Sequence, residues 1–387
     1  MRGALEILFW ACAGLILYAQ LGYYLVLRAL AALLRTPGER QAPPAGADEQ
    51  RPLPLVSLIV AAHNEQEVIE QKVANVRALD WPRERLELIV ACDGCSDQTA
   101  ARARAAGADL VLELERCGKV AAQDQAVARA RGAILAFSDA NSCWDRSALR
   151  VLLSAFADPR TGYACGQVRY SSGDPDATSQ EGVYWRYELA LRALESRLSS
   201  ITAGNGAIYA VPREAYMIVD PIMGHDLALP YRMLKRGLRA RYVPAAVAIE
   251  KMVPTIEGEL SRKRRMMAHT WPILLRGGML SPRGYPPGYY LMILSHRLLR
   301  YATPFLHLVA FGANLAAVTL GAGPLLIATL WLQGAIVLGA ALGGTLAWRP
   351  LLVARHYVLS TAAIALGLFD WLAHGTEPGW TQAEGTR

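Results

Sequence analysis

Two long stretches without an Asp, Glu, Lys or Arg residue constrain this chain most. The first runs from Ile7 to Leu27 and the second from Tyr301 to Trp348. Because about 20 apolar residues span a bilayer, the first stretch predicts one membrane helix and the second predicts two, with a turn at 321–324. A shorter stretch from Tyr357 to Leu372, which contains Asp370, predicts a fourth. The first stretch is expected to be a retained anchor, since no convincing cleavage site for a signal peptide follows it.

Basic residues flank all of these predicted helices. By the positive-inside rule the flanking segments face the cytoplasm, which puts the amino terminus outside and the middle of the chain inside. The carboxyl terminus would also be outside if the fourth stretch spans. The net charge of +7 is largely explained by these segments, so no nucleic-acid partner is expected. We therefore expect a multi-pass protein of the inner (plasma) membrane with a cytoplasmic middle domain. The flanking residues are Arg28, Arg35, Arg40, Arg297, Arg300, Arg349 and Arg355.

Between the apolar ends, short apolar runs alternate with helical patterns. Such alternation predicts an α/β domain with a doubly wound, mostly parallel sheet. The expected strands are 55–62, 86–91, 109–114 and 134–137, followed by 161–170 and 239–249. The six cysteines are scattered, and the pair Cys92 and Cys95 has no second pair to complete a zinc site. The expected domains are an anchor (1–35), a linker (36–54), the α/β domain (55–250), an interfacial basic segment (251–300), membrane helices (301–375) and a tail (376–387).

Three of the predicted strands end in polar clusters, at 63–65, 93–97 and 139–141. Right-handed crossovers bring these strand ends to one edge of the sheet. Lys119 is the main cation near them, and acidic groups beside a lysine suit a divalent metal that carries a diphosphate. The chain has neither a dinucleotide-binding fingerprint nor a P-loop, so metal and cations would hold the phosphates. The alternative is that Asp139 only caps the next helix.

Later in the chain, three further features stand out. Gly204, Asn205 and Gly206 predict a sharp turn that brings the backbone close to another strand or to a ligand. Asp226 opens a helix, where it could be only a first-turn acid stabilised by the helix dipole. A basic run at 262–265 precedes the membrane helices, where anionic lipid headgroups would also lie.

Taken together and in this order, these segments resemble a membrane-bound family 2 glycosyltransferase with the GT-A fold, in the group of cellulose, chitin and hyaluronan synthases. The resemblance covers about residues 56–265 plus the flanking helices. It implies that the strand-end residues bind the nucleotide, that Lys119 reaches the diphosphate, and that Asp139 and Asn141 bind Mg²⁺ or Mn²⁺. Asn141 stands where the family has a second aspartate. The implied nucleotide-binding residues are Ala62, Asn64, Glu65, Asp93, Gly94, Lys119 and Ser138.

The resemblance also assigns the acceptor side of the site. Asp226 matches the catalytic base of the family, with His225 in place of the usual glutamate. Arg262 and Arg265 match a basic motif for the diphosphate and acceptor, with Met266 where polymerising members have tryptophan. The turn at 204–206 would lie on the acceptor side.

The implied activity is inverting transfer from a nucleotide-diphosphate sugar, expected to be a UDP-sugar, to a lipid-linked or saccharide acceptor, giving a β-linkage. This would serve extracellular polysaccharide or glycolipid synthesis, with membrane lipids and oligomer or export partners. Few membrane helices and Met266 favour limited addition over a processive synthase that extrudes its polymer. A non-catalytic nucleotide-binding transporter or receptor is the other alternative, but the apolar stretches contain almost no ionisable residues of the kind that mark transport pathways.

Overall fold

The computed structural model describes residues 1–34, 53–171, 178–251, 256–346 and 348–379. The predicted linker 36–54 lies outside these residues except for its last two positions. Contacts divide the chain into two compact units. The helical unit comprises Met1–Ala29, Thr255–Trp271 and Leu291–Gly375, and the α/β unit comprises Leu30–Pro254, Pro272–Tyr290 and the tail from Thr376.

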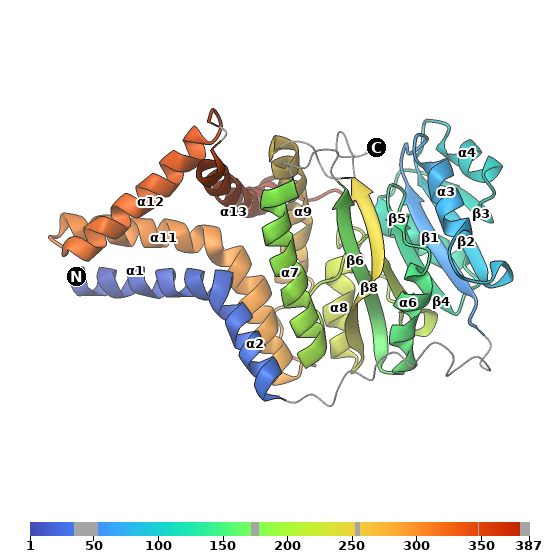
Figure 1. Cartoon of the computed structure of the whole chain (residues 1–387), viewed down its shortest axis with the longest axis horizontal. Coiled ribbons are helices and arrows are strands. Elements are labelled where there is room, and N and C mark those ends of the chain that lie inside the picture. Colours follow the sequence, from blue (N-terminus) through green and yellow to red (C-terminus); the bar gives the residue numbers. More distant parts are fainter. Residues whose placement is uncertain (35–52, 172–177, 252–255, 347, 380–387) are drawn as a thin grey trace. The chain divides into compact units, whose positions relative to one another are not determined.

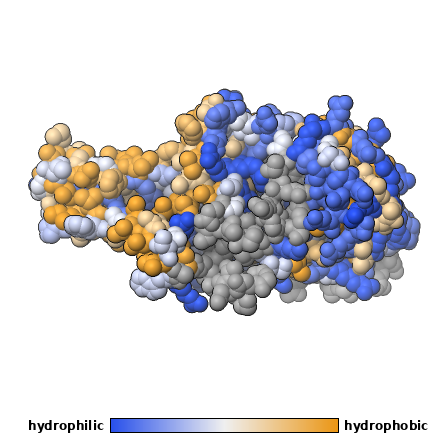
Figure 2. All heavy atoms as spheres, turned by 90° about the horizontal axis from the view of Figure 1, so that it is seen from above, coloured by the Kyte–Doolittle hydropathy of each residue, from blue (hydrophilic) through white to orange (hydrophobic). Residues whose placement is uncertain are grey.

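The helical unit contains long apolar helices from both ends of the chain (Figure 1). Among the described residues, four helices are long and apolar enough to cross a membrane: Arg2–Leu33, Pro287–Thr319, Pro324–Leu342 and Arg349–His374. On the face seen in Figure 2, apolar side chains gather over these helices, whereas the α/β unit is mostly hydrophilic. The helices that lie wholly or partly in this unit are α1 (Arg2–Leu17), α2 (Tyr23–Leu33), α9 (Ile256–Leu275), α10 (Pro287–Met292), α11 (Leu299–Thr319), α12 (Pro324–Leu342) and α13 (Arg349–His374), with π-helical turns at Tyr18–Gly22 and Ile293–Leu298.

The second apolar helix begins earlier than the sequence predicts. Arg297 and Arg300 were expected to precede it, yet both lie inside the helix Pro287–Thr319, and each is 8% exposed. The uncharged stretch that starts at Tyr301 marks only the part of the helix beyond these two arginines. The aromatic ring of Tyr301 packs near that of Trp271 on α9. The turn before α12 is at the predicted place, with Gly321 at φ 79° and Pro324 in the first turn of α12.

The α/β unit is built on one eight-stranded mixed sheet of order β3-β2-β1-β4-β7-β6-β8-β5. The strands β1 to β4 are mutually parallel where they pair, as the alternating pattern predicts, whereas β7 pairs antiparallel with β4 and β6. Helices pack around this sheet (Figure 1). The strands are β1 (Val56–Ala62), β2 (Leu86–Asp93), β3 (Leu110–Leu114), β4 (Ile134–Asp139), β5 (Cys143–Trp144), β6 (Thr161–Ser171), β7 (Tyr209–Pro212) and β8 (Arg239–Lys251). The helices are α3 (Ile69–Arg77), α4 (Thr99–Ala105), α5 (Lys119–Arg129), α6 (Ala148–Leu153), α7 (Thr178–Leu198) and α8 (His225–Lys235).

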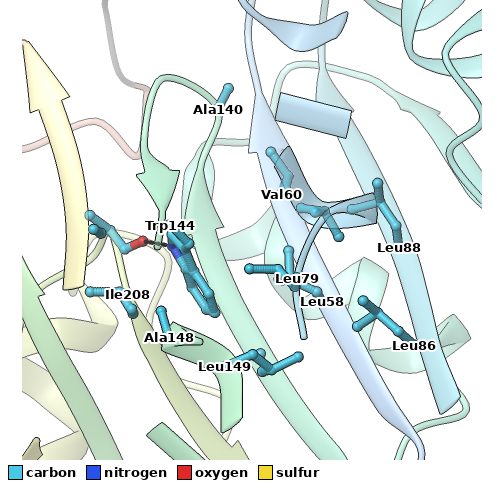
Figure 3. Close-up of a cluster of buried hydrophobic side chains, with 14 of the residues drawn as sticks. Leu58, Val60, Leu79, Leu86, Leu88, Ala140, Trp144, Ala148, Leu149 and Ile208 are labelled. Carbon is cyan, nitrogen blue, oxygen red and sulfur yellow. Dashed lines mark hydrogen bonds between the residues drawn. The ribbon is translucent and has the colours of Figure 1, made fainter. Parts of the chain in front are cut away.

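One face of this sheet carries the main hydrophobic core. Leu58 and Val60 of β1 and Leu88 of β2 are fully buried there, because alternate residues of a strand point to the same face. Trp144 and Leu149 pack against them, as Figure 3 shows. This packing holds the parallel strands in place, and the polar clusters follow directly after these strands.

Two short strands were not predicted, and β2, β4 and β8 each extend two residues beyond their predicted ends. Strand β5 has only two residues, too few to be recognised, whereas β7 lies in the apolar run 207–212, which the sequence analysis left unassigned. Strand β2 continues to Asp93, so this aspartate is the last residue of a rigid strand and not part of a loop. All six cysteines are free thiols.

Candidate active site

The carboxyl ends of β1, β2 and β4 lie at one edge of the sheet. Ala61 pairs with Asp139 across β1 and β4, and Ala62 pairs with Cys92 across β1 and β2. Because side chains alternate along a strand, Ser138 and Asp139 point to opposite faces. Ser138 contacts α3, and Asp139 contacts the first residue of α5.

Asp93 organises the loop that leads into α5. Its carboxylate is fully buried and accepts hydrogen bonds from the backbone N–H groups of Cys117, at 2.6 Å, and Gly118, at 3.1 Å. The guanidinium of Arg116 lies 3.8 Å from the same carboxylate. Gly118 has φ 92°, a backbone conformation that favours glycine. A buried carboxylate therefore sets the shape of the turn that begins α5.

Lys119, the first residue of α5, forms an ion pair with Asp139. The two side chains are 26% and 25% exposed, so both reach a solvent-accessible space. Burial alone would lower the pKa of Lys119, but the carboxylates of Asp139 and Asp226 raise it above its usual value. The ammonium is therefore charged at neutral pH and lies in a field of acidic groups.

The residues after β1 join the loops that follow β1 and β2. His63 Nδ1 lies 2.7 Å from the backbone oxygen of Asp93. Asn64, at φ 54°, accepts a hydrogen bond from the Ser96 N–H with its side-chain oxygen, at 2.8 Å. The backbone N–H of Glu65 donates to the Thr99 hydroxyl at 2.8 Å. These bonds hold the first two polar clusters together at the edge of the sheet.

The predicted turn at 204–206 lies next to both Asp226 and Lys119. The Gly204 N–H donates to the backbone oxygen of Asp226 at 2.7 Å. A Cβ atom on Gly206 would lie 3.3 Å from Lys119 Nζ, so glycine allows the backbone to approach the lysine closely. The side chain of Asn205 donates to the Gly166 carbonyl at 2.6 Å and holds the turn on β6.

His225, which precedes Asp226 in α8, is buried among tyrosines. Its Nδ1 lies 2.9 Å from the Tyr209 hydroxyl and its Nε2 lies 3.4 Å from the Tyr216 hydroxyl. Burial, with a smaller contribution from Lys119, lowers the pKa of His225 to about 3. The imidazole is therefore neutral where the resemblance has a carboxylate. The hydroxyl of Tyr216 in turn donates to Asp124 Oδ1 on α5 at 2.5 Å.

The comparisons with known proteins agree with this geometry. The profile described as "Glycosyl transferase family 2" matches residues 57–215, which include β1 to β4 and the turn at 204–206. The chain contains a family 2 glycosyltransferase domain. It is thus an enzyme of the class that the motifs resemble.

This glycosyltransferase is similar to curated proteins over much of its length. An N-acetylglucosaminyltransferase from Rhizobium meliloti is 27% identical over 88% of this chain and 78% of its own length. A poly-beta-1,6-N-acetyl-D-glucosamine synthase from Staphylococcus aureus is 23% identical over 57% of this chain and 56% of its own length. A probable glycosyltransferase from Bacillus subtilis is 23% identical over 54% of this chain and 53% of its own length. The chain spans only about half the length of the latter two.

A solved structure shows the same fold. It is a mannosyltransferase from Pyrobaculum calidifontis in complex with GDP-Man and Mn²⁺, with a TM-score of 0.75, 23% identity, and coverage of 95% of this chain and 99% of that one. The expected fold class, a GT-A α/β domain with one amino-terminal and three carboxyl-terminal apolar helices, is therefore confirmed.

The glycosyltransferase domain gathers most of the predicted site residues, and leaves two in the other unit. Asp139, Lys119 and the turn at 204–206 are connected by the contacts above, and Asp93 adjoins them through Gly118. Ser138 lies on the opposite face of β4, where its hydroxyl donates to the Ala207 carbonyl at 3.1 Å. Asn141 follows β4 in the turn that leads to β5. Arg262 and Arg265 lie on α9 in the helical unit, where Arg262 donates to Glu259 at 2.6 and 2.7 Å. Their role at the diphosphate or the acceptor stays a prediction.

The donor atoms of the glycosyltransferase site fit a metal ion that arrives with a diphosphate. Among the described residues, no group of three or more His, Cys, Asp or Glu side chains could hold a metal ion. Mg²⁺ is commonly bound through one or two carboxylates plus substrate phosphates and waters, without a complete protein cage. Asp139 would offer one carboxylate and Asn141 one amide oxygen to such an ion, with the remaining ligands coming from phosphate oxygens and water.

Sequence reasoning missed the residues that support the strand end from the α3 face. Lys72 and Asn75 of α3 contact the segment 138–144, which ends at Trp144. A signal for Lys72 was present, since it falls within the apolar stripe of α3 formed by Ile69, Val73 and Val76, a position where a lysine is unexpected.

Proposed function

We propose that the chain transfers a sugar from a UDP-sugar to a membrane-associated or growing saccharide acceptor, with inversion at the anomeric carbon. The observation that carries this proposal is the meeting of Lys119, Asp139 and the Gly204–Asp226 contact beside the buried Asp93. In this site Lys119 would bind the diphosphate, the Asp139 carboxylate would bind a metal ion, and Asp226 would act as a separate general base.

In this proposal the residues after β1 and β2 bind the uridine part of the donor. The backbone around Ala62, Asn64 and Glu65 is fixed by the bonds to Ser96 and Thr99, so the nucleotide meets a preformed surface. Gly94, at φ 60°, lets the chain turn directly after Asp93. Arg116 and Lys119 lie on either side of Gly118, and their charges suit the diphosphate.

Lys119 and Asp139 form an ion pair that binding of the nucleotide-sugar donor would break. Both side chains reach solvent, so the ammonium can turn to a diphosphate oxygen while the carboxylate turns to the cation. A bound Mg²⁺ or Mn²⁺ would neutralise charge on the diphosphate leaving group. Lys119 adds to this stabilisation by a charge-assisted hydrogen bond to the leaving group.

The acceptor hydroxyl requires a base, and we assign that role to Asp226. Its backbone is fixed by the first turn of α8 and by the Gly204 N–H, and its side chain is not buried by the core. Because burial lowers the pKa of the neighbouring His225 to about 3, its neutral imidazole is too weak a base to compete for the acceptor proton. Direct attack on an α-linked donor would give a β-linked product.

The four apolar helices support a location in the inner (plasma) membrane with the α/β unit in the cytoplasm, where nucleotide sugars are made available. Similarity to an N-acetylglucosaminyltransferase and to a polysaccharide synthase favours an N-acetylhexosaminyl or hexosyl donor and a glycan or glycolipid product. We favour limited addition over extrusion of a polymer, because Met266 replaces the tryptophan of polymerising members.

A donor panel tests this proposal. The purified, detergent-solubilised chain is incubated with UDP- and GDP-sugars, Mn²⁺ or Mg²⁺, and membrane lipid extract or short oligosaccharides, and release of the nucleotide diphosphate is measured. We expect metal-dependent turnover with at least one UDP-sugar and a short product by mass spectrometry. Binding without turnover across the whole panel would contradict the proposal, and a long polymer would replace limited addition by processive synthesis.

A further inference from the structure

Lys72 places an ammonium group inside the hydrophobic core beneath β4. The side chain is 2% exposed and lies on α3 beside Ile69, Val73 and Val76, which are fully buried. Burial lowers the pKa of Lys72 to about 7. An ammonium in such a place is costly unless its hydrogen bonds are satisfied, so its partners explain why a lysine is tolerated here.

Those partners lie on either side of the predicted metal-binding turn. Lys72 Nζ donates to the hydroxyl of Ser138 at 2.6 Å and to the backbone carbonyl of Ser142 at 2.6 Å. The three residues between them are 139–141, the segment that contains Asp139 and Asn141. One ammonium therefore joins the two ends of this turn from the side opposite to Lys119.

Asn75, one helical turn beyond Lys72, fixes the next part of the same segment. Its side-chain amide donates to the Trp144 carbonyl at 2.8 Å and accepts from the Trp144 N–H at 2.9 Å. One side chain on α3 therefore satisfies both backbone polar groups of Trp144, in addition to the pairing of β5 with β8. α3 thus holds the chain at both ends of 138–144.

The same network reaches the turn at 204–206. The indole N–H of Trp144 donates to the Ala207 carbonyl at 2.9 Å, the bond drawn as a dashed line in Figure 3, and the Ser138 hydroxyl also lies 3.1 Å from that carbonyl. The Trp144 ring lies 5.5 Å from Lys72 Nζ. The hydrogen bonds that hold the 138–144 segment therefore also hold Ala207, the residue that follows the turn at 204–206.

We propose that Lys72 and Asn75 are positioning residues that preorganise the Asp139–Asn141 turn to receive a divalent cation together with a diphosphate. The proposal rests on the proposed function, which puts the cation at this turn. Asn141 offers a neutral oxygen and attracts a cation less than a carboxylate would, so binding depends more on the turn already having its final shape.

Mn²⁺ binding measured without turnover tests this proposal. The full-length protein in detergent is titrated with Mn²⁺ in the presence of UDP, and free Mn²⁺ is followed by electron paramagnetic resonance. Lys72→Met keeps the length of the side chain and removes the ammonium, and Gln71→Met, at an exposed position on the same helix, is the matched control. We expect Lys72→Met to raise the apparent Kd for Mn²⁺ by about 10–100-fold, the usual cost of losing an outer-shell partner, and Gln71→Met to leave it unchanged.

Turnover separates positioning from a general structural role. Transfer by Lys72→Met is expected to return to within about threefold of wild type at saturating Mn²⁺, so that the apparent KM for the metal rises while kcat is nearly kept. A Lys72→Met protein with wild-type Mn²⁺ affinity, or with a loss of kcat that no Mn²⁺ concentration restores, overturns the proposal.

If Lys72→Met does not fold, Asn75→Ala tests the same proposal. It removes the two bonds to Trp144 from a half-buried position, and we expect weaker Mn²⁺ binding with the UDP affinity measured in the absence of metal unchanged. Unchanged Mn²⁺ affinity in this variant overturns the proposal. If wild-type protein binds UDP but no Mn²⁺, the proposed metal site fails and this proposal fails with it, an outcome distinct from equal Mn²⁺ binding by wild type and variants.

Discussion

One lysine lies against each face of β4, and the surroundings of the two lysines differ. We call the side covered by α5 the Lys119 face and the side covered by α3 the Lys72 face. On the α5 face, Lys119 is 26% exposed and pairs with the carboxylate of Asp139. On the α3 face, Lys72 is 2% exposed and donates to a hydroxyl and a backbone carbonyl. Consecutive residues of one strand, Ser138 and Asp139, are the partners, because a strand turns successive side chains to opposite faces.

This difference distinguishes a residue that can exchange partners from one that cannot. Lys119 can leave Asp139 for a diphosphate, since water and ligand reach both groups and either can be solvated during the exchange. If Lys72 moved, a buried hydroxyl and a buried carbonyl would lose a hydrogen bond in a region without solvent. The exposed face is therefore suited to chemistry, and the buried face is suited to holding the turn in place.

The largest expected effect tests whether the chemistry lies on the Lys119 face. Asp226→Asn removes the proposed base beside the 204–206 turn, and general-base catalysis typically contributes about 10²–10⁴-fold. We expect the rate of transfer to fall by that order while the affinity for UDP, measured by calorimetry, stays within about twofold of wild type. Full transfer activity in Asp226→Asn would show that another group accepts the proton.

The next largest expected effect is the loss of activity when either lysine is replaced by methionine. Lys119→Met should lower kcat by about 10²–10³-fold, as removal of a charge-stabilising donor commonly does, and excess Mn²⁺ should not restore it. Lys72→Met should lose activity at low Mn²⁺ and regain it at high Mn²⁺. Steady-state rates over a Mn²⁺ titration compare the two variants directly. The same response in both would remove the distinction between the two faces.

Much of the Lys119 face could be predicted from the sequence, because its signals are local. The apolar runs 55–62, 86–91 and 134–137 predict parallel strands, and the topology of such sheets predicts that their ends meet, as β1, β2 and β4 do. The position of Asp226 at the start of α8 was predicted in the same way from a local pattern. The roles of these residues stay proposals.

The Lys72 face could not be predicted, because its contacts join residues far apart in the chain. Lys72 and Ser142 are separated by 70 positions, and Trp144 reaches Ala207 over 63. No helical or strand period links such residues. The strand β5 was missed for the same reason, since its two residues are too few to be recognised without β8.

The smallest expected effect concerns Asp124, a half-buried acid on α5. Burial raises the pKa of Asp124 from 3.8 to about 6. Between these values the folded protein keeps a proton that the unfolded chain has lost, so stability decreases as the pH rises through this window and stays lower above it. An asparagine at position 124 cannot ionise, but its amide oxygen can still accept a hydrogen bond from the Tyr216 hydroxyl. We therefore expect Asp124→Asn to raise Tm over wild type by about 2–4 °C more at pH 7.5 than at pH 4.

Thermal unfolding followed by fluorescence at the two pH values measures this difference. Asp80→Asn, which changes an exposed acid paired with Arg150, is the control and should show no such pH dependence. A gain in Tm for Asp124→Asn that is the same at both pH values would mean that Asp124 ionises normally in the folded protein.

The most direct test of the whole account is Mn²⁺ binding by Asp139→Asn in the presence of UDP. The account places the cation between the diphosphate and the single carboxylate at the end of β4, so replacing that carboxylate by a neutral amide should remove most of the Mn²⁺ affinity while UDP still binds. We predict no saturable Mn²⁺ binding by Asp139→Asn at concentrations that saturate wild type and the Asp80→Asn control. Equal Mn²⁺ affinity in wild type and Asp139→Asn would contradict the account.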